Sequence, residues 1–192
     1  MAPVPPLQMR FVTSASRHDT LPPSDAEVAF VGRSNVGKSS LVNALANQKQ
    51  LAKVSKTPGR TQLINLFELG DGSTVVDLPG YGFANAPRAV RDAWGPMIED
   101  YLQGRDGLLR IVVLVDGEIG PTKLDVTMFE WLRALGLPYA VVATKHDKVK
   151  SSARQKRRRE LAAGCGVDEK AVTWVSAAKG TNIDLLRSRI HE

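Results

Sequence analysis

Short apolar runs alternate along this chain with longer segments in which apolar residues recur at helical spacing. The runs predict strands near residues 28–31, 62–69, 73–77, 110–115, 139–143 and 171–175. The periodic segments predict helices near residues 38–47, 88–102, 122–135, 151–163 and 182–190. Because strands and helices alternate, we expect an α/β fold with a mixed, mostly parallel six-stranded sheet and helices on both faces.

Some positions refine this pattern. Gly70-Asp71-Gly72 separates two apolar runs and predicts a hairpin, which is why the sheet is expected to be mixed. Phe11 begins a weaker segment, a candidate for a further edge strand. Gly95-Pro96 predicts a kink or break in the helix near 88–102, which would suit either a moving segment or ordinary packing. The core face of helix 122–135 is expected to consist of Leu124, Met128, Trp131, Leu132 and Leu135.

A loop with the spacing GxxxxGK[ST] lies between the first predicted strand and helix, at Gly32-Arg33-Ser34-Asn35-Val36-Gly37-Lys38-Ser39. Its glycines allow backbone N–H groups to face phosphate oxygens, and the following helix presents its positive end to the same anion. Lys38 supplies a cation for the outer phosphates, and the Ser39 hydroxyl can bind Mg²⁺. A Gly-rich turn can precede a helix by chance, but here strand, loop and helix occur in the required order. The sequence therefore predicts binding of a nucleoside triphosphate.

Two further segments are candidates for sensing the γ-phosphate. A strand ends in DxxG at Asp77-Leu78-Pro79-Gly80, where Asp77 can hold Mg²⁺ through water and Gly80 can turn its N–H toward the phosphate. The second segment is Thr57-Pro58-Gly59-Arg60-Thr61, which is rich in turn formers. On chemistry alone, Thr57 and Thr61 both qualify as the threonine that completes the Mg²⁺ shell. A surface loop without a ligand role is the alternative for this second segment.

The base of the nucleotide is predicted from two segments near the C-terminus. In Thr144-Lys145-His146-Asp147 the Asp147 carboxylate can accept hydrogen bonds from N1–H and the N2 amine of guanine. Adenine lacks both donors, and two charge-assisted bonds of about 1.5–3 kcal/mol each discriminate by roughly hundreds-fold or more. Lys145 is expected to pack along the base and to tie this loop to the phosphate-binding loop. Val175-Ser176-Ala177-Ala178-Lys179 is expected to supply backbone N–H groups to guanine O6.

Taken together, these segments resemble the EngB family of ribosome-biogenesis GTP-binding proteins. The most specific matches are GRSNVGKSSLVNAL at 32–45, TPGRTQLINLF at 57–67 and DLPGYGFA at 77–84. The stretch from Leu114 to Asp125 and TKHDK at 144–148 support them, and the similarity runs from about Phe11 to the C-terminus. The resemblance implies that Thr61 is the threonine that binds Mg²⁺, and that the protein acts in assembly of the large ribosomal subunit.

The motifs and the resemblance together predict one site for GTP or GDP. Its expected nucleotide contacts are Gly32, Arg33, Ser34, Asn35, Val36, Gly37, Lys38, Ser39, Ser40, Gly59, Arg60, Thr61, Gln62, Leu63, Asp77, Leu78, Pro79, Gly80, Thr144, Lys145, His146, Asp147, Val175, Ser176, Ala177 and Ala178. Mg²⁺ is the expected cofactor, bound by Ser39 and Thr61 directly and by Asp77 through water. Asn35, Lys38 and Thr61 are the residues expected to act in hydrolysis.

One departure from Ras-like proteins bears on hydrolysis. These carry a glutamine after DxxG that orients the attacking water, whereas this chain has Tyr81. In the wider group that includes EngB, Era and TrmE-like proteins, an asparagine of the phosphate-binding loop helps to bind K⁺, and it matches Asn35. The resemblance therefore implies slow unassisted hydrolysis that K⁺ raises more than Na⁺ does. On the residues alone, Asn35 could also be a local turn residue.

Bulk properties limit the class of protein. The chain has 192 residues, which suits one domain, and we expect an N-terminal extension over 1–23, partly flexible, before a single GTP-binding domain over 24–192. No apolar run is long enough to span a membrane. The single cysteine, Cys165, fits a reducing cytoplasm, and a Pro-rich N-terminus that lacks acidic residues before Asp19 keeps an organelle matrix as an alternative.

Charge suggests a polyanionic partner. The net charge is +6, concentrated at residues 145–150 and at Arg154-Gln155-Lys156-Arg157-Arg158-Arg159. The second run is expected to lie on a helix capped by Ser151 or Ser152 and ending at Gly164. This helix face could be simply solvated or could contact phosphates of ribosomal RNA in the large subunit or its precursor. No stretch indicates a constitutive dimer, so a monomer is expected. Signalling or scaffold proteins that bind GTP without a ribosomal role are the alternative functions.

Overall fold

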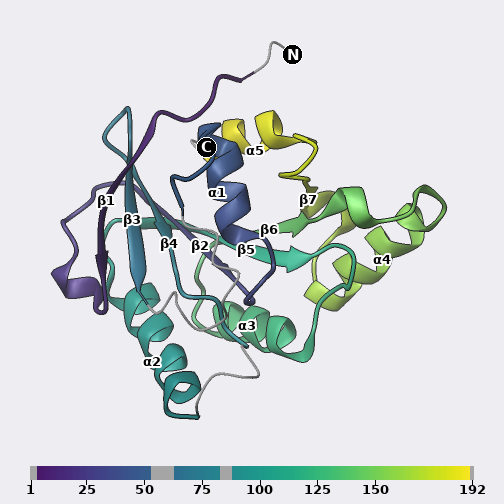
Figure 1. Cartoon of the computed structure of the whole chain (residues 1–192). Coiled ribbons are helices and arrows are strands. Elements are labelled where there is room, and N and C mark those ends of the chain that lie inside the picture. The colour runs from purple at the N-terminus through teal and green to yellow at the C-terminus, as the bar shows by residue number, and fades with distance from the viewer. Residues whose placement is uncertain (1–3, 53–62, 83–87, 191–192) are drawn as a thin grey trace.

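A seven-stranded sheet forms the middle layer of the protein (Figure 1). The computed structural model describes residues 4–52, 63–82 and 88–190. The strands are β1 (Met9–Ala15), β2 (Glu27–Gly32), β3 (Ile64–Leu69), β4 (Thr74–Asp77), β5 (Leu108–Asp116), β6 (Tyr139–Thr144) and β7 (Val172–Trp174). They are ordered β1-β3-β4-β2-β5-β6-β7 across the sheet. β1, β3 and β4 pair antiparallel, whereas all other neighbours are parallel, which confirms a mixed, mostly parallel sheet.

The expected number of strands was one too few. Instead of a six-stranded sheet, the structure has seven strands, because β1 pairs antiparallel with β3 from Met9 opposite Leu69 to Ala15 opposite Ile64. β1 lies at an edge of the sheet, and only Met9 of its residues is buried. A strand with so little burial has a weak alternation of apolar and polar residues, which is why the sequence pattern gave only Phe11 as a hint.

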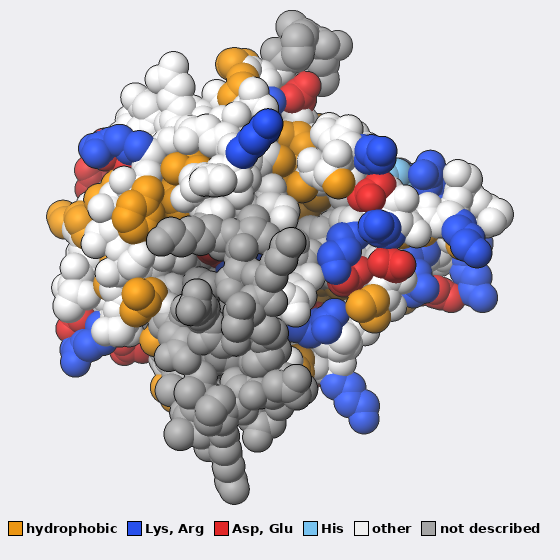
Figure 2. Space-filling view, viewed as in Figure 1, with side chains coloured by type: hydrophobic (Ala, Val, Ile, Leu, Met, Phe, Trp, Pro, Cys, Tyr) orange, Lys and Arg blue, Asp and Glu red, His pale blue; other side chains and the backbone are white. Residues whose placement is uncertain are grey.

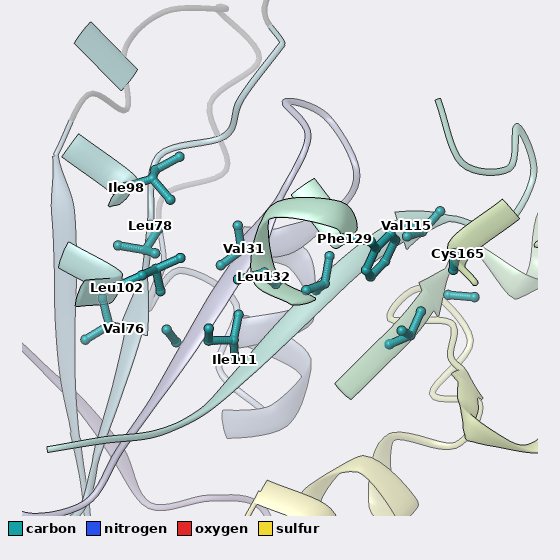
Figure 3. Packing of buried hydrophobic residues seen from close by; sticks show 14 of the residues in the cluster. Val31, Val76, Leu78, Ile98, Leu102, Ile111, Val115, Phe129, Leu132 and Cys165 are labelled. Carbon is teal, nitrogen blue, oxygen red and sulfur yellow. The ribbon is translucent and has the colours of Figure 1, made fainter. Parts of the chain in front are cut away.

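Helices cover both faces of the sheet. α1 (Lys38–Ala46) and α5 (Ile183–Ile190) lie on one face, where Leu41, Leu45 and Leu186 join a buried cluster with the strands. α2 (Arg88–Gly104), α3 (Lys123–Ala134) and α4 (Arg154–Cys165) lie on the other. Figure 3 shows this second cluster, in which Ile98 and Leu102 of α2 and Phe129 and Leu132 of α3 point toward strand residues such as Val31 and Ile111.

Three helix predictions need correction. In α3 the buried residues are Asp125, Phe129 and Leu132, whereas Leu124 and Leu135 are 49% and 39% exposed. α4 begins at Arg154, after a 3-10 turn at Ser151–Ala153, and ends at Cys165 with Gly166 in the left-handed region (φ 68°) rather than at Gly164. α2 is continuous from Arg88 to Gly104, so Gly95-Pro96 does not break the helix, and a kink there stays a prediction.

The parallel strands bring four loops to one edge of the sheet. β2, β4, β5 and β6 run in the same direction, so the loops that follow Gly32, Asp77, Asp116 and Thr144 share that edge. Ligands of open α/β sheets bind outside the carboxyl ends of the strands. In the part of the chain that the structure describes, no helix is long and apolar enough to cross a membrane.

Candidate nucleotide-binding site

The loop between β2 and α1 is held in a conformation that few residue types adopt. Gly37, which precedes the first turn of α1, has φ 103°, and Asn35 has φ 65°, both in the left-handed region. At the start of the loop, a Cβ on Gly32 would lie 3.0 Å from the carbonyl oxygen of Leu114. The backbone can therefore pass close to β5 and turn sharply into the helix. This directs the N-terminus of α1, with its free N–H groups, toward the same edge of the sheet.

The loop after β4 is joined to this phosphate-binding loop through Ser34. The Ser34 N–H donates to the Tyr81 carbonyl (2.8 Å), and its hydroxyl donates to the Gly80 carbonyl (3.0 Å). The Tyr81 N–H donates to the Gly32 carbonyl at 3.3 Å. Gly80 is so near that a Cβ there would lie 3.0 Å from the Ser34 backbone nitrogen. A side chain at position 80 would therefore push the two loops apart.

Lys38 and Asp77 form a buried ion pair where the two loops meet. Lys38 is 8% exposed at the start of α1, and Asp77 is 1% exposed at the end of β4. Each charge thus compensates the other away from water. A phosphate that enters the loop would compete with Asp77 for the Lys38 ammonium.

A pocket of about 210 Å³ lies beside this loop and is lined by residues of the two predicted guanine segments and of α1. Among its lining residues are Gly37, Lys145, Asp147 and Ala177. The Ser176 hydroxyl donates a 2.5 Å hydrogen bond to Asp147 Oδ1, and this bond is the main reason that the pKa of Asp147 lies below its ordinary value. The carboxylate is therefore charged at neutral pH and held in place by the second segment.

The neighbouring residues fix the position of the Asp147 loop. The Thr144 hydroxyl donates to the Val36 carbonyl at 2.6 Å, a hydrogen bond to the phosphate-binding loop that the sequence did not indicate. Lys145, in the left-handed region at φ 54°, donates instead to Asp116 Oδ2 at 2.6 Å. The His146 N–H donates to the Val175 carbonyl at 3.0 Å, which joins the two guanine segments.

The structure brings the predicted phosphate and guanine segments together, but their side chains differ in how far they are exposed to solvent. Val36, Leu78 and Val175 are fully or almost fully buried, so only their backbones can face a ligand. Asn35 and Ser40 are exposed, and Ser39 is partly buried. Leu63 is 42% exposed just before β3. Gly59, Arg60, Thr61 and Gln62 lie outside the described residues, as does Thr57.

Sequence reasoning missed two buried carboxylates near this edge. Asp116 at the end of β5 is 2% exposed and accepts bonds from the N–H groups of Glu118 (3.0 Å) and Ile119 (3.2 Å) besides that from Lys145. Asp125 of α3 is 1% exposed and accepts from the Tyr81 hydroxyl at 2.7 Å. Both belong to the Leu114–Asp125 stretch. Asp116 follows an apolar strand as Asp77 does, a signal that could have identified it.

The donor set suits Mg²⁺. In nucleotide sites this ion is bound by one or two carboxylates or hydroxyls together with substrate phosphates, and not by an all-protein cage. The Ser39 hydroxyl and the Asp77 carboxylate are oxygen donors of this kind at the junction of the two loops. Among the described residues there is no cluster of three or more His, Cys, Asp or Glu residues that would indicate a different metal site.

Comparison with known proteins agrees with this geometry. A family model described as "50S ribosome-binding GTPase" matches residues 27–145, which contain the loops after Gly32, Asp77 and Asp116 but end before Asp147. The chain is 45% identical over 185 residues to a probable GTP-binding protein EngB of Geotalea daltonii, covering 96% of this chain and 89% of that protein.

This chain belongs to the EngB family of P-loop GTPases. A second EngB protein, from Geobacter sulfurreducens, is 47% identical over 94% of this chain and 88% of its own length. The crystal structure of a probable GTP-binding protein EngB superposes with a TM-score of 0.72 at 30% identity, covering 86% of this chain and 97% of that one. Membership in EngB is consistent with a pocket beside the phosphate-binding loop, and GTPases of this fold use Mg²⁺ with GTP.

Proposed function

We propose that this EngB protein is a GTP-dependent switch that hydrolyses GTP slowly and acts in assembly of the large ribosomal subunit. The observation that supports the nucleotide part is the Asp147 pocket, which opens beside Gly37 at the phosphate-binding loop. The ribosomal part is supported by the family model, whose description names 50S ribosome binding. The net charge of +6 is consistent with a partner rich in phosphate.

In the nucleotide site, each loop has a proposed task. N–H groups of residues 32–40 and the Lys38 ammonium bind the phosphates, Asp147 accepts from guanine N1–H and N2, and N–H groups of Ser176, Ala177 and Ala178 face O6. Lys145, anchored on Asp116, packs along the base. The γ-phosphate recruits Lys38 from Asp77, and the Gly80 N–H then senses that phosphate.

Oxygen atoms of the protein are proposed to bind two metal ions that assist hydrolysis. Ser39, Asp77 and Thr61 would hold Mg²⁺, which neutralises charge on the β- and γ-phosphates. The Asn35 amide oxygen would bind K⁺ beside the phosphates, where a second positive charge does the work of an arginine finger. Tyr81 is no substitute for a water-orienting glutamine, because its hydroxyl is bonded to Asp125. The attacking water would then be oriented by backbone groups and bound ions, which accounts for a slow reaction.

The switch works through the loop after β4. In the structure this loop is fastened to Ser34 and to Asp125, so a change at Gly80 is transmitted to both α3 and the phosphate-binding loop. GTP would select one arrangement of this loop and of residues 57–61, and hydrolysis would release it. A scaffold that binds GTP without turnover, or a signalling GTPase with no ribosomal role, is the competing function.

Sedimentation of the full-length protein with purified 50S subunits and with 50S precursors tests the proposal. The mixtures contain GDP, a non-hydrolysable GTP analogue or no nucleotide, in K⁺ buffer. We expect co-sedimentation that requires the GTP analogue and is lost in Lys38→Ala. Association that is equal in all three conditions would favour the scaffold. Absence of association, with nucleotide binding verified by a fluorescent GDP analogue, would overturn the ribosomal role and leave a guanine-nucleotide switch.

A further inference from the structure

The free edge of β7 carries a second pocket, of about 270 Å³, whose lining residues differ from those of the guanine pocket. β7 is the last strand of the sheet, so this pocket lies at the opposite end from β1. Its walls come from α4, β7, α5 and the 3-10 turn Glu169–Ala171. The polar residues that define it are Arg158, Glu169, Lys170, Trp174, Asn182 and Arg189.

Positive charge in this pocket exceeds negative charge. Arg158, Lys170 and Arg189 supply three cations, and Glu169 supplies the one carboxylate among the lining residues. Glu169 accepts a hydrogen bond from Gln155, and Arg189 donates to the Thr173 hydroxyl. Within the described part of the chain, the Arg158 and Lys170 side chains have neither an ion-pair nor a hydrogen-bond partner. Two positive charges are therefore left without compensation.

Two buried donors also lack acceptors here. The Nε–H of Arg158 and the Nε1–H of Trp174 are inaccessible to solvent and have no hydrogen-bond partner among the described residues. Buried polar groups in native proteins are almost always hydrogen-bonded, and leaving one unpaired costs about 1–3 kcal/mol. Both residues line the pocket, and the described residues offer their buried N–H groups no acceptor.

The surroundings extend this positive region along α4. Figure 2 shows Lys and Arg side chains gathered on the side of the molecule where Figure 1 places α4. Arg154, one helical turn before Arg158, lies on the same side of the helix. Burial lowers the pKa of the nearby His146, and the positive charges of Arg154 and Arg158 lower it further. Lys156, which is exposed, and Arg157, which also donates to the Ile119 carbonyl at 3.3 Å, are within ion-pair distance of Glu160, at 3.7 and 3.5 Å.

We infer that the pocket between α4 and α5 binds a phosphate group of an RNA backbone, with Arg158, Lys170 and Arg189 as its contacts. Trp174 is 5% exposed, so it cannot stack on a base, and recognition is directed at phosphate rather than at sequence. Guanidinium groups match phosphate oxygens in a bidentate arrangement. Cations spaced from the pocket along α4 suit a continuous phosphate backbone better than a single small anion. Only the identification of this RNA as ribosomal rests on the proposed function.

The test is a salt titration of RNA binding by the full-length protein loaded with GDP. The probe is a short fluorescein-labelled RNA hairpin, and polyglutamate is the competing acidic polypeptide. The variant Arg158→Gln/Lys170→Gln removes two charges whose side chains make no hydrogen bond or ion pair with other described residues. The matched control, Arg10→Gln/Lys49→Gln, removes two exposed charges, at β1 and after α1. Binding of a fluorescent GDP analogue verifies that both variants are folded.

We expect the pocket variant to bind the hairpin about tenfold more weakly than the wild type. The slope of the logarithm of the binding constant against the logarithm of the salt concentration should be smaller in magnitude by about two. The control should stay close to the wild type. Equal losses in both variants, or competition by polyglutamate as effective as that by unlabelled RNA, would overturn the inference. Arg189→Lys gives a second measure, because it keeps the charge and removes the planar fork. Its affinity should fall, and an affinity equal to that of the wild type would count against the assignment of Arg189.

The same variants separate this inference from the ribosomal role. If the wild-type protein binds the hairpin through these residues but does not sediment with 50S subunits, the assignment of the phosphate site stands and the proposed ribosomal function is wrong. Sedimentation with 50S subunits that persists in a variant unable to bind RNA would place the ribosomal contact elsewhere, and would overturn a role for this pocket on the ribosome.

Discussion

The Tyr81 hydroxyl donates a 2.7 Å hydrogen bond to Oδ1 of Asp125, which joins the loop after β4 to the first turn of α3. The other oxygen of Asp125 accepts from the N–H and the hydroxyl of Thr122, both at 2.7 Å, so the carboxylate also caps the helix. Burial, reinforced by the Asp125 charge, raises the pKa of Tyr81. The phenol is therefore a neutral donor at neutral pH.

Replacement of Tyr81 by Phe tests this contact. The change keeps the ring but leaves a buried carboxylate oxygen without its donor, so the free energy of unfolding should fall by about 1–3 kcal/mol. Amide hydrogen exchange at Ser34 should become faster, because its N–H is bonded to the Tyr81 carbonyl. Tyr139→Phe is the control, since the Tyr139 hydroxyl accepts only an exposed 3.2 Å bond from Arg133. Equal urea midpoints for the two variants would contradict the prediction.

Replacement of Asp147 by Asn should change the preferred base. The amide loses both charge-assisted bonds to guanine and offers an N–H to the O2 carbonyl of xanthine, so GTP affinity should fall by roughly hundreds-fold while XTP affinity rises. Competition against a fluorescent GDP analogue measures both. Ser176→Ala, which removes only the donor to Asp147, should weaken GTP binding without improving XTP binding. If Asp147→Asn discriminated against XTP as the wild type does, the proposed base contact would be wrong.

K⁺ stimulation of hydrolysis should depend on the Asn35 amide oxygen. Asn35 has φ 65°, and this left-handed backbone by itself could account for an asparagine at this position. Asn35→Gly preserves the conformation and removes the side-chain amide. We expect Asn35→Gly to bind GTP but to hydrolyse it at equal rates in K⁺ and Na⁺. Phosphate release in the two salts measures this. If K⁺ still raised the rate of hydrolysis in Asn35→Gly, the role of Asn35 would be limited to the conformation of the turn.

A buried carboxylate at the opposite end of β2 should depend strongly on its cation, and removal of this cation should lower the free energy of unfolding. Glu27 is fully buried and accepts from Arg105 at 2.8 and 2.9 Å and from the Thr74 hydroxyl at 2.9 Å. Arg105→Met leaves this charge without its cation and should lower the free energy of unfolding by about 3–5 kcal/mol. Arg10→Met breaks an exposed pair with Glu68 and should cost less than about 1 kcal/mol. Comparable urea midpoints for the two variants would refute the difference.

Cys165 should be inert in the folded protein. The residue is fully buried, and burial raises the pKa of its thiol from an ordinary value of 9.0 to about 12. Because only the thiolate reacts, a disulfide reagent at pH 8 should label the native protein far more slowly than the protein in urea. Absorbance of the released thiol gives both rates. Fast labelling under native conditions would show that the α4 end opens readily.

The sequence by itself determined the order of the strands from β2 onward and of the helices, and it located the loop between β2 and α1. These features are local: GxxxxGK[ST] encodes a turn with defined backbone angles, and apolar runs encode strands, whatever lies elsewhere in the chain. The pattern failed where burial is slight, as in β1, and where the buried side of a helix depends on its neighbour, as in α3, whose Leu124 lies outside the core.

Only the tertiary structure decided which side chains meet. Asp116 anchors Lys145, Ser176 orients Asp147 and Asp125 holds Tyr81, across separations of 29, 29 and 44 residues along the chain. The three cations of the β7 pocket likewise come from α4, a 3-10 turn and α5. Such pairs depend on the packing of helices against a sheet whose strand order differs from the chain order, and local propensity carries no information about that order.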